Sequence, residues 1–132
     1  MRLLIISHTP HYLKVGQVVG WGSTVMEIDQ LAKMFTEITH LAPLHEGEPP
    51  ESSLPYQSPK VKVVLVKPAG GRSLAQKLSY FWRIPHWFTV MRSELIQADA
   101  VHIRCPAGIS VMGLLAQSLF GKEIPCWVKY AG

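Results

Sequence analysis

The sequence predicts an α/β fold: a Rossmann-like, mostly parallel sheet of about five strands with helices on both faces. Three observations predict it. The chain opens with the apolar run 3–6, which is typical of a strand buried on both faces of a parallel sheet. Similar runs then alternate with amphipathic helical stretches, as in successive βα units. Of the 132 residues, 48% are hydrophobic and 17% are charged, which is the balance of a packed globule, and the length fits one domain over 1–132.

The strands follow from apolar or β-branched runs that are bounded by proline, glycine or polar residues. The alternation of strands and helices implies right-handed crossovers, and we expect the order 3-2-1-4-5, counting these strands alone. Residues 44–60 are rich in Pro, Glu and Ser and are expected to form a long surface loop. The five strands are expected at 3–7, 37–42, 61–66, 100–104 and 125–130.

Apolar residues at helical spacing predict three helical regions between the strands. Two of these regions open with a capping-box pattern, a hydroxyl residue followed three positions later by Glu or Gln. Pro85 is expected to break or kink the second region, because proline has no backbone N–H to donate. The first helix is expected from Thr24 to about Phe35, with Glu27 in its capping box. The second is expected from Ser73, with Gln76 in its capping box, to Trp82, and a further helical piece follows at 86–97. The third is expected at 109–120, with Gly121 as its C-cap.

The composition excludes several classes of protein. No apolar stretch approaches the roughly 18 residues of a membrane span, and the opening run is too short for a secretory signal. Cys105 and Cys126 form no C-x-x-C pair, which favours a reduced, cytoplasmic setting. The basic residues do not build a recognisable nucleic-acid reader, so no nucleic-acid partner is expected.

Residues 72–92 interleave basic and bulky aromatic side chains, within a stretch that carries no acidic residue. Ordinary core with a basic, solvated rim is one interpretation of this segment. The others are a groove for an acceptor, docking on a partner protein, and peripheral contact of a cytoplasmic protein with an anionic membrane surface.

A candidate ligand site follows from the strand order. In an open α/β sheet, ligands bind beyond the carboxyl ends of the strands, where the order reverses. That point lies between the exits of the first and fourth strands, which places His8 and His11 on one side and Arg104 on the other. Arg104 is the candidate for a catalytic role because its guanidinium fits phosphate, and the alternative is that it binds carbonyls of its own loop. The two histidines lack a third ligand of suitable spacing, so no metal site is expected.

A glycine loop, defined here as Gly16, Gly20 and Gly22 with the Ser23 that follows, leads into the first helix. The spacing is neither G-x-G-x-x-G nor that of a P-loop, so dinucleotide binding and ATP hydrolysis are not indicated. Unobstructed backbone N–H groups ahead of a helix N-terminus favour binding of phosphate or a sugar diphosphate. A flexible turn, with Trp21 packed as an anchor, is the alternative.

These segments together resemble the N-terminal lobe of family 4 glycosyltransferases. The resemblance rests on the opening strand, the glycine loop, the segment 98–106 and the closing residues 128–132. It implies one half of a GT-B fold, in which the glycine loop approaches the donor diphosphate and the fourth strand's exit lines the acceptor site. In the family's D-x-x-H-x-H pattern, Asp99 and His102 match the first two marked positions, whereas Arg104 occupies the third. The role of the last histidine therefore does not carry over to this chain.

The function expected from this resemblance is that of the acceptor-side lobe of a retaining, metal-independent glycosyltransferase. The acceptor would be a glycan or a lipid-linked sugar. A UDP- or GDP-sugar would be held by a C-terminal lobe or a partner chain, so this lobe is expected to bind no cofactor alone and to be inactive in isolation. The alternative is a non-catalytic module that docks through residues 72–92. A free-standing nucleotide-binding domain is less favoured, because 41–43 at the end of the second strand lack the acidic residue that contacts ribose.

Overall fold

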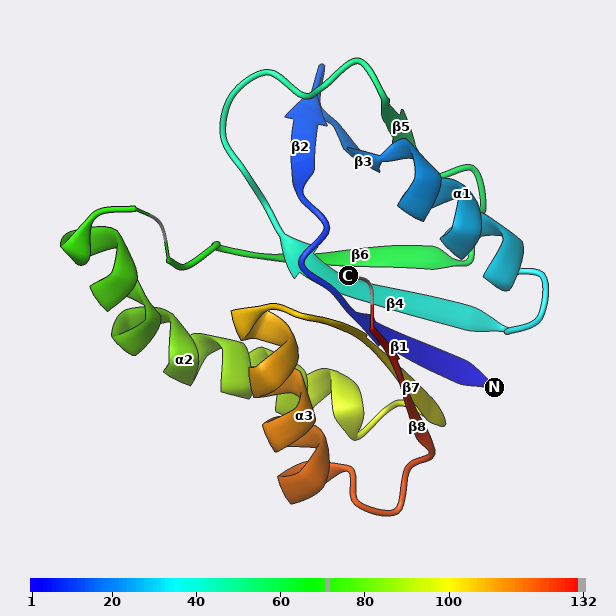
Figure 1. Ribbon diagram of the computed structural model, residues 1–132. Helices are drawn as coiled ribbons and strands as arrows, with labels where there is room; N and C mark the ends of the chain where they lie inside the picture. The colour runs from blue at the N-terminus through cyan, green and yellow to red at the C-terminus, as the bar shows by residue number, and fades with distance from the viewer. Residues whose placement is uncertain (71, 131–132) are drawn as a thin grey trace.

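A five-stranded parallel sheet forms the centre of the protein in the computed structural model, which describes residues 1–70 and 72–130. The predicted α/β class is confirmed, and the five predicted strands have the predicted neighbours. The order differs in detail from 3-2-1-4-5 in its strand numbers, because three further short strands are counted along the chain and form a second sheet. The central sheet has the order β6-β4-β1-β7-β8, with β1 (Arg2–Ile6), β4 (Glu37–Pro43), β6 (Val61–Val66), β7 (Ala100–Cys105) and β8 (Cys126–Tyr130) (Figure 1).

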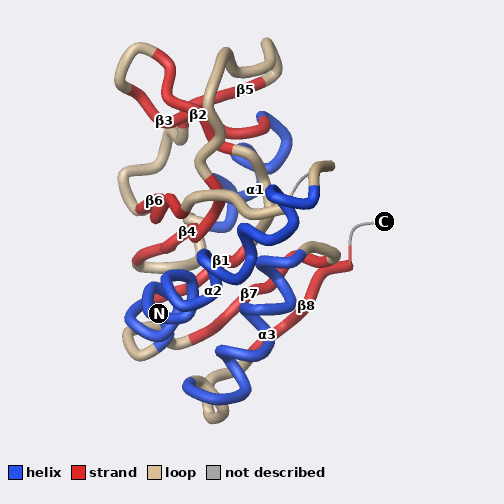
Figure 2. The backbone as a smooth tube through the Cα atoms, turned by 90° about the vertical axis from the view of Figure 1, so that its left-hand side faces the viewer, coloured by secondary structure: helices blue, strands red, loops and turns tan. Residues whose placement is uncertain are grey.

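Helices cover both faces of this sheet, as predicted (Figures 1 and 2). Successive side chains of a strand point to opposite faces, so Leu3 and Ile5 pack with Ile28 of α1 (Gly22–Leu31). Leu4 and Ile6 pack on the other face, against α2 (Leu74–Leu95) and α3 (Gly108–Phe120). Burial on both faces explains why β1 is a continuous apolar run. The second face has the larger cluster, which includes Trp87, Met91, Leu95, Ile109 and Ala116.

The prediction of a loop between β1 and α1 is wrong in part, because a β-hairpin occupies most of it. Its strands are β2 (His11–Lys14) and β3 (Gln17–Trp21), and Val15 and Gly16 form the turn with φ values of 51° and 75°. A short strand within the expected loop 44–60, β5 (Ser53–Pro55), pairs with β3. The small sheet β2-β3-β5 stands above the carboxyl side of the central sheet (Figure 1).

The start of α1 also differs from the prediction. The helix begins at Gly22 with Trp21 as its N-cap, and no side chain of the described chain caps it. The expected capping box of Thr24 and Glu27 does not form, because the Glu27 carboxylate binds Arg104 and Lys129 instead. Long-range ion pairing therefore determines the conformation of this side chain.

The expected break in the second helix does not occur, since α2 continues through Pro85. Its predicted start is confirmed: Ser73 and Gln76 form a reciprocal capping box. The missing N–H of Pro85 leaves the Phe81 carbonyl without its helical donor, and both residues lie on the exposed side, where water can replace that bond. The predicted C-cap of α3 at Gly121 is confirmed.

Candidate functional site

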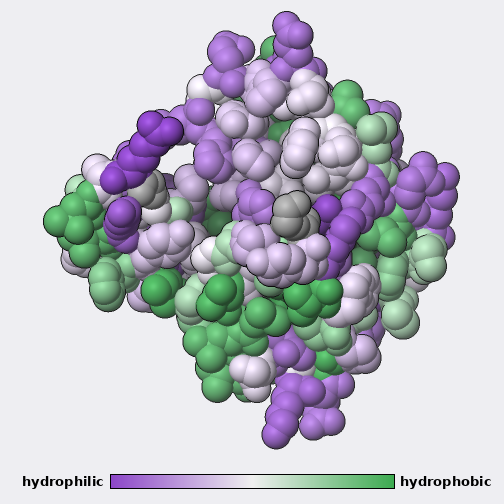
Figure 3. Space-filling model, viewed as in Figure 1, coloured by the Kyte–Doolittle hydropathy of each residue, from purple (hydrophilic) through white to green (hydrophobic). Residues whose placement is uncertain are grey.

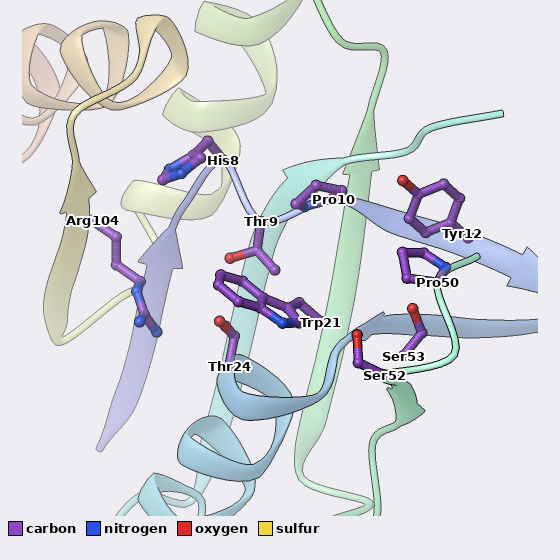
Figure 4. Close-up of a pocket in the computed structure, with 10 residues that line it drawn as sticks. All are labelled: His8, Thr9, Pro10, Tyr12, Trp21, Thr24, Pro50, Ser52, Ser53 and Arg104. Carbon is purple, nitrogen blue, oxygen red and sulfur yellow. The ribbon is translucent and has the colours of Figure 1, made fainter. Parts of the chain in front are cut away.

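A cleft opens where β1 and β7 end, at the place that the strand order predicts. The two strands pair directly, and the cleft lies between their exits, the β2–β3 hairpin and the N-terminus of α1. Its volume is about 540 Å³, which is within the range of small-molecule sites. The lining residues are His8, Thr9, Pro10, Tyr12, Trp21, Thr24, Pro50, Ser52, Ser53 and Arg104 (Figure 4).

The cleft combines an aromatic wall with hydroxyl groups. In Figure 4, Trp21 lies in the middle of the lining residues, with His8 and Arg104 at one end and Tyr12 at the other. Trp21 is 57% exposed although it is the N-cap of α1, and it lines the cleft, so its indole ring is accessible to a ligand there. Serine and threonine hydroxyls donate and accept hydrogen bonds, and Thr9, Thr24, Ser52 and Ser53 place four of them on the lining. This arrangement suits a ligand that has both an apolar face and several hydroxyl groups.

Arg104 contributes the positive charge of the cleft and is held by an ion-pair network. Its Nη2 donates to Glu27 Oε2 at 3.1 Å, and the Lys129 Nζ donates to Glu27 Oε1 at 3.0 Å. Partial burial by itself would raise the pKa of Glu27, but the hydrogen bond from Lys129 and the charge of Arg104 lower it below its ordinary value. Two cations share one carboxylate, so the network has a net positive charge beside the cleft.

His11 does not line the cleft, contrary to the prediction, because its ring is fully buried in a polar network. Its Nδ1 donates to the Thr9 carbonyl at 2.8 Å, so in the neutral ring Nε2 is the acceptor and receives the Tyr56 hydroxyl, also at 2.8 Å. The Tyr56 oxygen in turn accepts from His40 Nδ1 at 2.7 Å. His40 Nε2 then accepts from the Ser7 hydroxyl at 2.6 Å.

The network closes on itself and has one consistent set of proton positions. The backbone N–H of Thr9 donates to Ser7 Oγ at 3.3 Å, which completes the ring from Ser7 through His40, Tyr56 and His11 back to Thr9. Burial lowers the pKa of His11, and it lowers the pKa of His40 to well below the ordinary histidine value. Burial also raises the pKa of the Tyr56 hydroxyl. All three side chains are therefore neutral near pH 7, as the proton assignment requires.

Ser7 and His40 have the spacing of a nucleophile and a general base, but their burial excludes that role. Ser7 and His40 are both fully buried, and the Ser7 oxygen also accepts a backbone N–H. The network instead attaches the hairpin and the segment after β5 to the sheet beneath the cleft. His40 and Tyr56 were not predicted, and the available signal was a histidine at the centre of the buried strand 37–43.

The glycine loop serves the packing of the chain. A Cβ atom at Gly20 would lie 2.7 Å from His11 Nε2, and one at Gly22 would lie 2.4 Å from the Ser52 carbonyl, which already accepts the Gly22 N–H at 3.0 Å. Gly16 lies at the hairpin turn with open space around it. Ser23 is exposed on α1 but is not one of the residues that line the cleft. Close contact within the protein therefore explains Gly20 and Gly22, and a positive φ explains Gly16.

The remaining predicted residues divide between the cleft and the core. His8 is exposed and lines the cleft together with Arg104. His102, which matches the second marked position of the resemblance's pattern, is buried within β7. It stacks on Trp127 of β8, with ring centroids 4.8 Å apart. Among residues 1–70 and 72–130, no group of three His, Cys, Asp or Glu side chains is placed to hold a metal ion.

Comparison with known proteins supports the fold but assigns the chain to no family. No family model matches the sequence, and no curated protein matches it. A similar solved structure is the C-terminal domain of a hydrogenase from Pyrococcus furiosus, with a TM-score of 0.51 and 14% sequence identity. The match covers 97% of this chain and 90% of that domain. At this identity the similarity shows a shared α/β fold and carries no information about ligand or activity.

Proposed function

We propose that this chain is the acceptor-side lobe of a nucleotide-sugar-dependent, retaining glycosyltransferase, and that the cleft at the exits of β1 and β7 binds a sugar ring of the acceptor. The observation that carries the proposal is the combination of an exposed indole with four hydroxyl-bearing side chains on one lining. A pyranose has apolar C–H faces and a rim of hydroxyl groups. It can therefore stack on Trp21 while it exchanges hydrogen bonds with Thr9, Thr24 and the serines of 52–53.

The side chains that line the cleft suit ligand binding better than catalysis. Among the described residues that line the cleft there is neither a carboxylate nor a thiol, which leaves His8 as the candidate general base on its wall. His8 is exposed at one end, and Arg104 is held by Glu27. In this proposal Arg104 orients a polar or anionic group of the acceptor, which is a binding role.

The donor would be a UDP- or GDP-sugar held by a C-terminal lobe or a partner chain that faces the same cleft. Group transfer requires donor and acceptor to be held together in near-attack geometry, and one wall of a cleft does not supply this. We therefore expect no release of UDP or GDP when this 132-residue chain is incubated with a nucleotide sugar and a glycan.

The test is calorimetric titration of the protein with the methyl glycosides of glucose, mannose and N-acetylglucosamine. We expect at least one to bind, and Trp21→Ala to weaken that binding by about tenfold or more through loss of the stacking surface. Trp82→Ala is the matched control, since Trp82 is 81% exposed on α2 and is not part of the cleft. If no glycoside binds, or if both variants bind equally well, the carbohydrate assignment is wrong.

A further inference from the structure

Helix α2 carries two apolar stripes, and the fold uses only one of them. The inner stripe includes Trp87, Met91 and Leu95, which are buried against the sheet. A second stripe, here called the outer stripe, consists of Leu74, Leu78, Phe81 and Trp82. Their spacing of i, i+4, i+7 and i+8 places them on one face of the helix. These four side chains are 74%, 46%, 73% and 81% exposed, respectively.

The outer stripe lies on the part of α2 that extends furthest from the sheet. In Figure 1 the N-terminal turns of α2 project to the left, beyond β6. In the same view, Figure 3 shows hydrophobic surface at this position with hydrophilic side chains beside it. An exposed cluster of large apolar side chains marks a candidate site of association. None of the four residues lines the cleft at β1 and β7, so this surface is separate from the proposed sugar site.

Basic residues precede and interleave with the outer stripe in the sequence. Residues 52–93 contain no Asp or Glu, and the exposed Lys67, Arg72 and Lys77 lie before or within the first turns of α2. The acidic residues fall elsewhere in the sequence, with Glu46, Glu48 and Glu51 before this region and Glu94 after it. The surface thus combines aromatic side chains with a positive charge that no neighbouring acid in the sequence offsets. Its natural complement is both apolar and anionic.

We propose that the outer stripe of α2 docks this protein on an anionic membrane surface. The helix would lie in the plane of the interface, with Phe81 and Trp82 at the depth of the headgroups and Lys77 and Arg72 reaching lipid phosphates. Lysine and arginine suit this position because their long stems lie along apolar surface while their charges stay in water. No helix among residues 1–70 and 72–130 is long and apolar enough to cross a membrane.

The experiment is flotation of the purified chain with vesicles of phosphatidylcholine alone and with vesicles that also contain phosphatidylglycerol. We expect flotation with the anionic vesicles only, and its loss as the salt concentration rises to about 1 M, where the Debye length is about 3 Å. The double variant Phe81→Ser with Trp82→Ser should lower partitioning by about tenfold or more. Lys77→Glu should lower it by about fivefold or more.

Two control variants test whether vesicle binding depends on the outer stripe in particular or on any exposed apolar or basic side chain. Met34→Ser alters a side chain that is 77% exposed outside the outer stripe, and Lys14→Glu reverses an exposed charge on β2. Both controls should float like the unaltered protein, and far-UV circular dichroism should show that every variant is folded. Absence of flotation, equal flotation with neutral vesicles, or flotation that survives the stripe variants would each overturn the proposal. Self-association that depends on Phe81 and Trp82, without vesicle binding, would also overturn it by identifying a protein interface.

Discussion

The Arg104 guanidinium lies 3.1 Å from the Glu27 carboxylate and thereby links the exit of β7 to α1 beside the cleft. The two residues are 77 positions apart in the sequence. The Arg104 side chain is only 12% exposed, whereas that of Glu27 is 36% exposed and also binds Lys129. Glu27 therefore orients Arg104, and the arginine presents its charge to one end of the cleft.

Replacing Arg104 by Ala should weaken saccharide binding by about fivefold or more, because the cleft loses a multidentate donor. The cost in the free energy of unfolding should be about 1 kcal/mol, since the Glu27 carboxylate is 36% exposed and keeps Lys129 as a partner. Calorimetry and urea denaturation measure the two effects. Lys129→Ala is the control: it removes the other partner of Glu27 without touching the lining. Equal binding by the unaltered protein and Arg104→Ala would remove Arg104 from the site.

The buried histidines predict a loss of stability in acid. The pKa values of His11 and His40 are lower in the folded state than the ordinary value of 6.5, so the unfolded chain binds protons that the folded chain does not. This contribution to stability is fully present above about pH 6.5 and is lost as the pH falls below it. Below about pH 6.5 each such histidine should contribute a slope of at most about 1.4 kcal/mol per pH unit, for as long as its ring stays neutral in the folded state.

Urea denaturation at a series of pH values between about 7.5 and 5 measures this slope. His40→Gln should reduce it, because one of the neutral buried imidazoles is removed. His86→Gln, at an exposed position of α2, is the matched control. A free energy of unfolding that is independent of pH over this range would contradict the proposed protonation of the network.

Gly20→Ala should destabilise the protein by about 2 kcal/mol, because the new methyl group would overlap the His11 ring and separate it from Tyr56. Thermal unfolding reports the loss. Gly16→Asn is the comparison, since nothing lies within 4 Å of a Cβ there and asparagine tolerates a positive φ. If both variants melt at the temperature of the unaltered protein, the close contact between Gly20 and His11 is not present in solution.

Val15→Asn should stabilise the hairpin by about 1 kcal/mol. A β-branched residue is strained at φ 51°, and Asn-Gly is the preferred pair for a two-residue hairpin turn with both φ values positive. Val15 is fully exposed, so the change removes no packing. Leu13→Asn, at an exposed strand position, should not stabilise the protein. An unchanged or lower midpoint of urea denaturation for Val15→Asn would argue against this turn.

Local pattern was enough to predict the central sheet. The runs at 3–7 and 61–66 have the composition of buried parallel strands, and handedness limits how they can connect. The hairpin escaped prediction because Val15 and Gly16 do not match the usual Asn-Gly signal, and Trp21 lies between two glycines. β5 was missed because a strand of three residues has too little pattern to detect.

Features that depend on distant partners could not be predicted. Glu27 has the spacing of a capping box, yet it binds Arg104 and Lys129, which lie 77 and 102 positions further along the chain. His11 was placed at the strand exit correctly, but its orientation depends on Tyr56, which is 45 positions away. Strand order was sufficient to bring His8 and Arg104 to one cleft, whereas the contributions of Trp21 and 52–53 required the second sheet.

The most direct test of the proposed function is to locate saccharide binding by amide and indole chemical shifts of ¹⁵N-labelled protein, titrated with the three methyl glycosides. We predict that the perturbed signals are those of the cleft, including the Trp21 indole, Thr9 and Arg104, while the outer stripe of α2 is unaffected. Signals that move only outside the cleft, or a spectrum unchanged at saturating glycoside, would contradict the account.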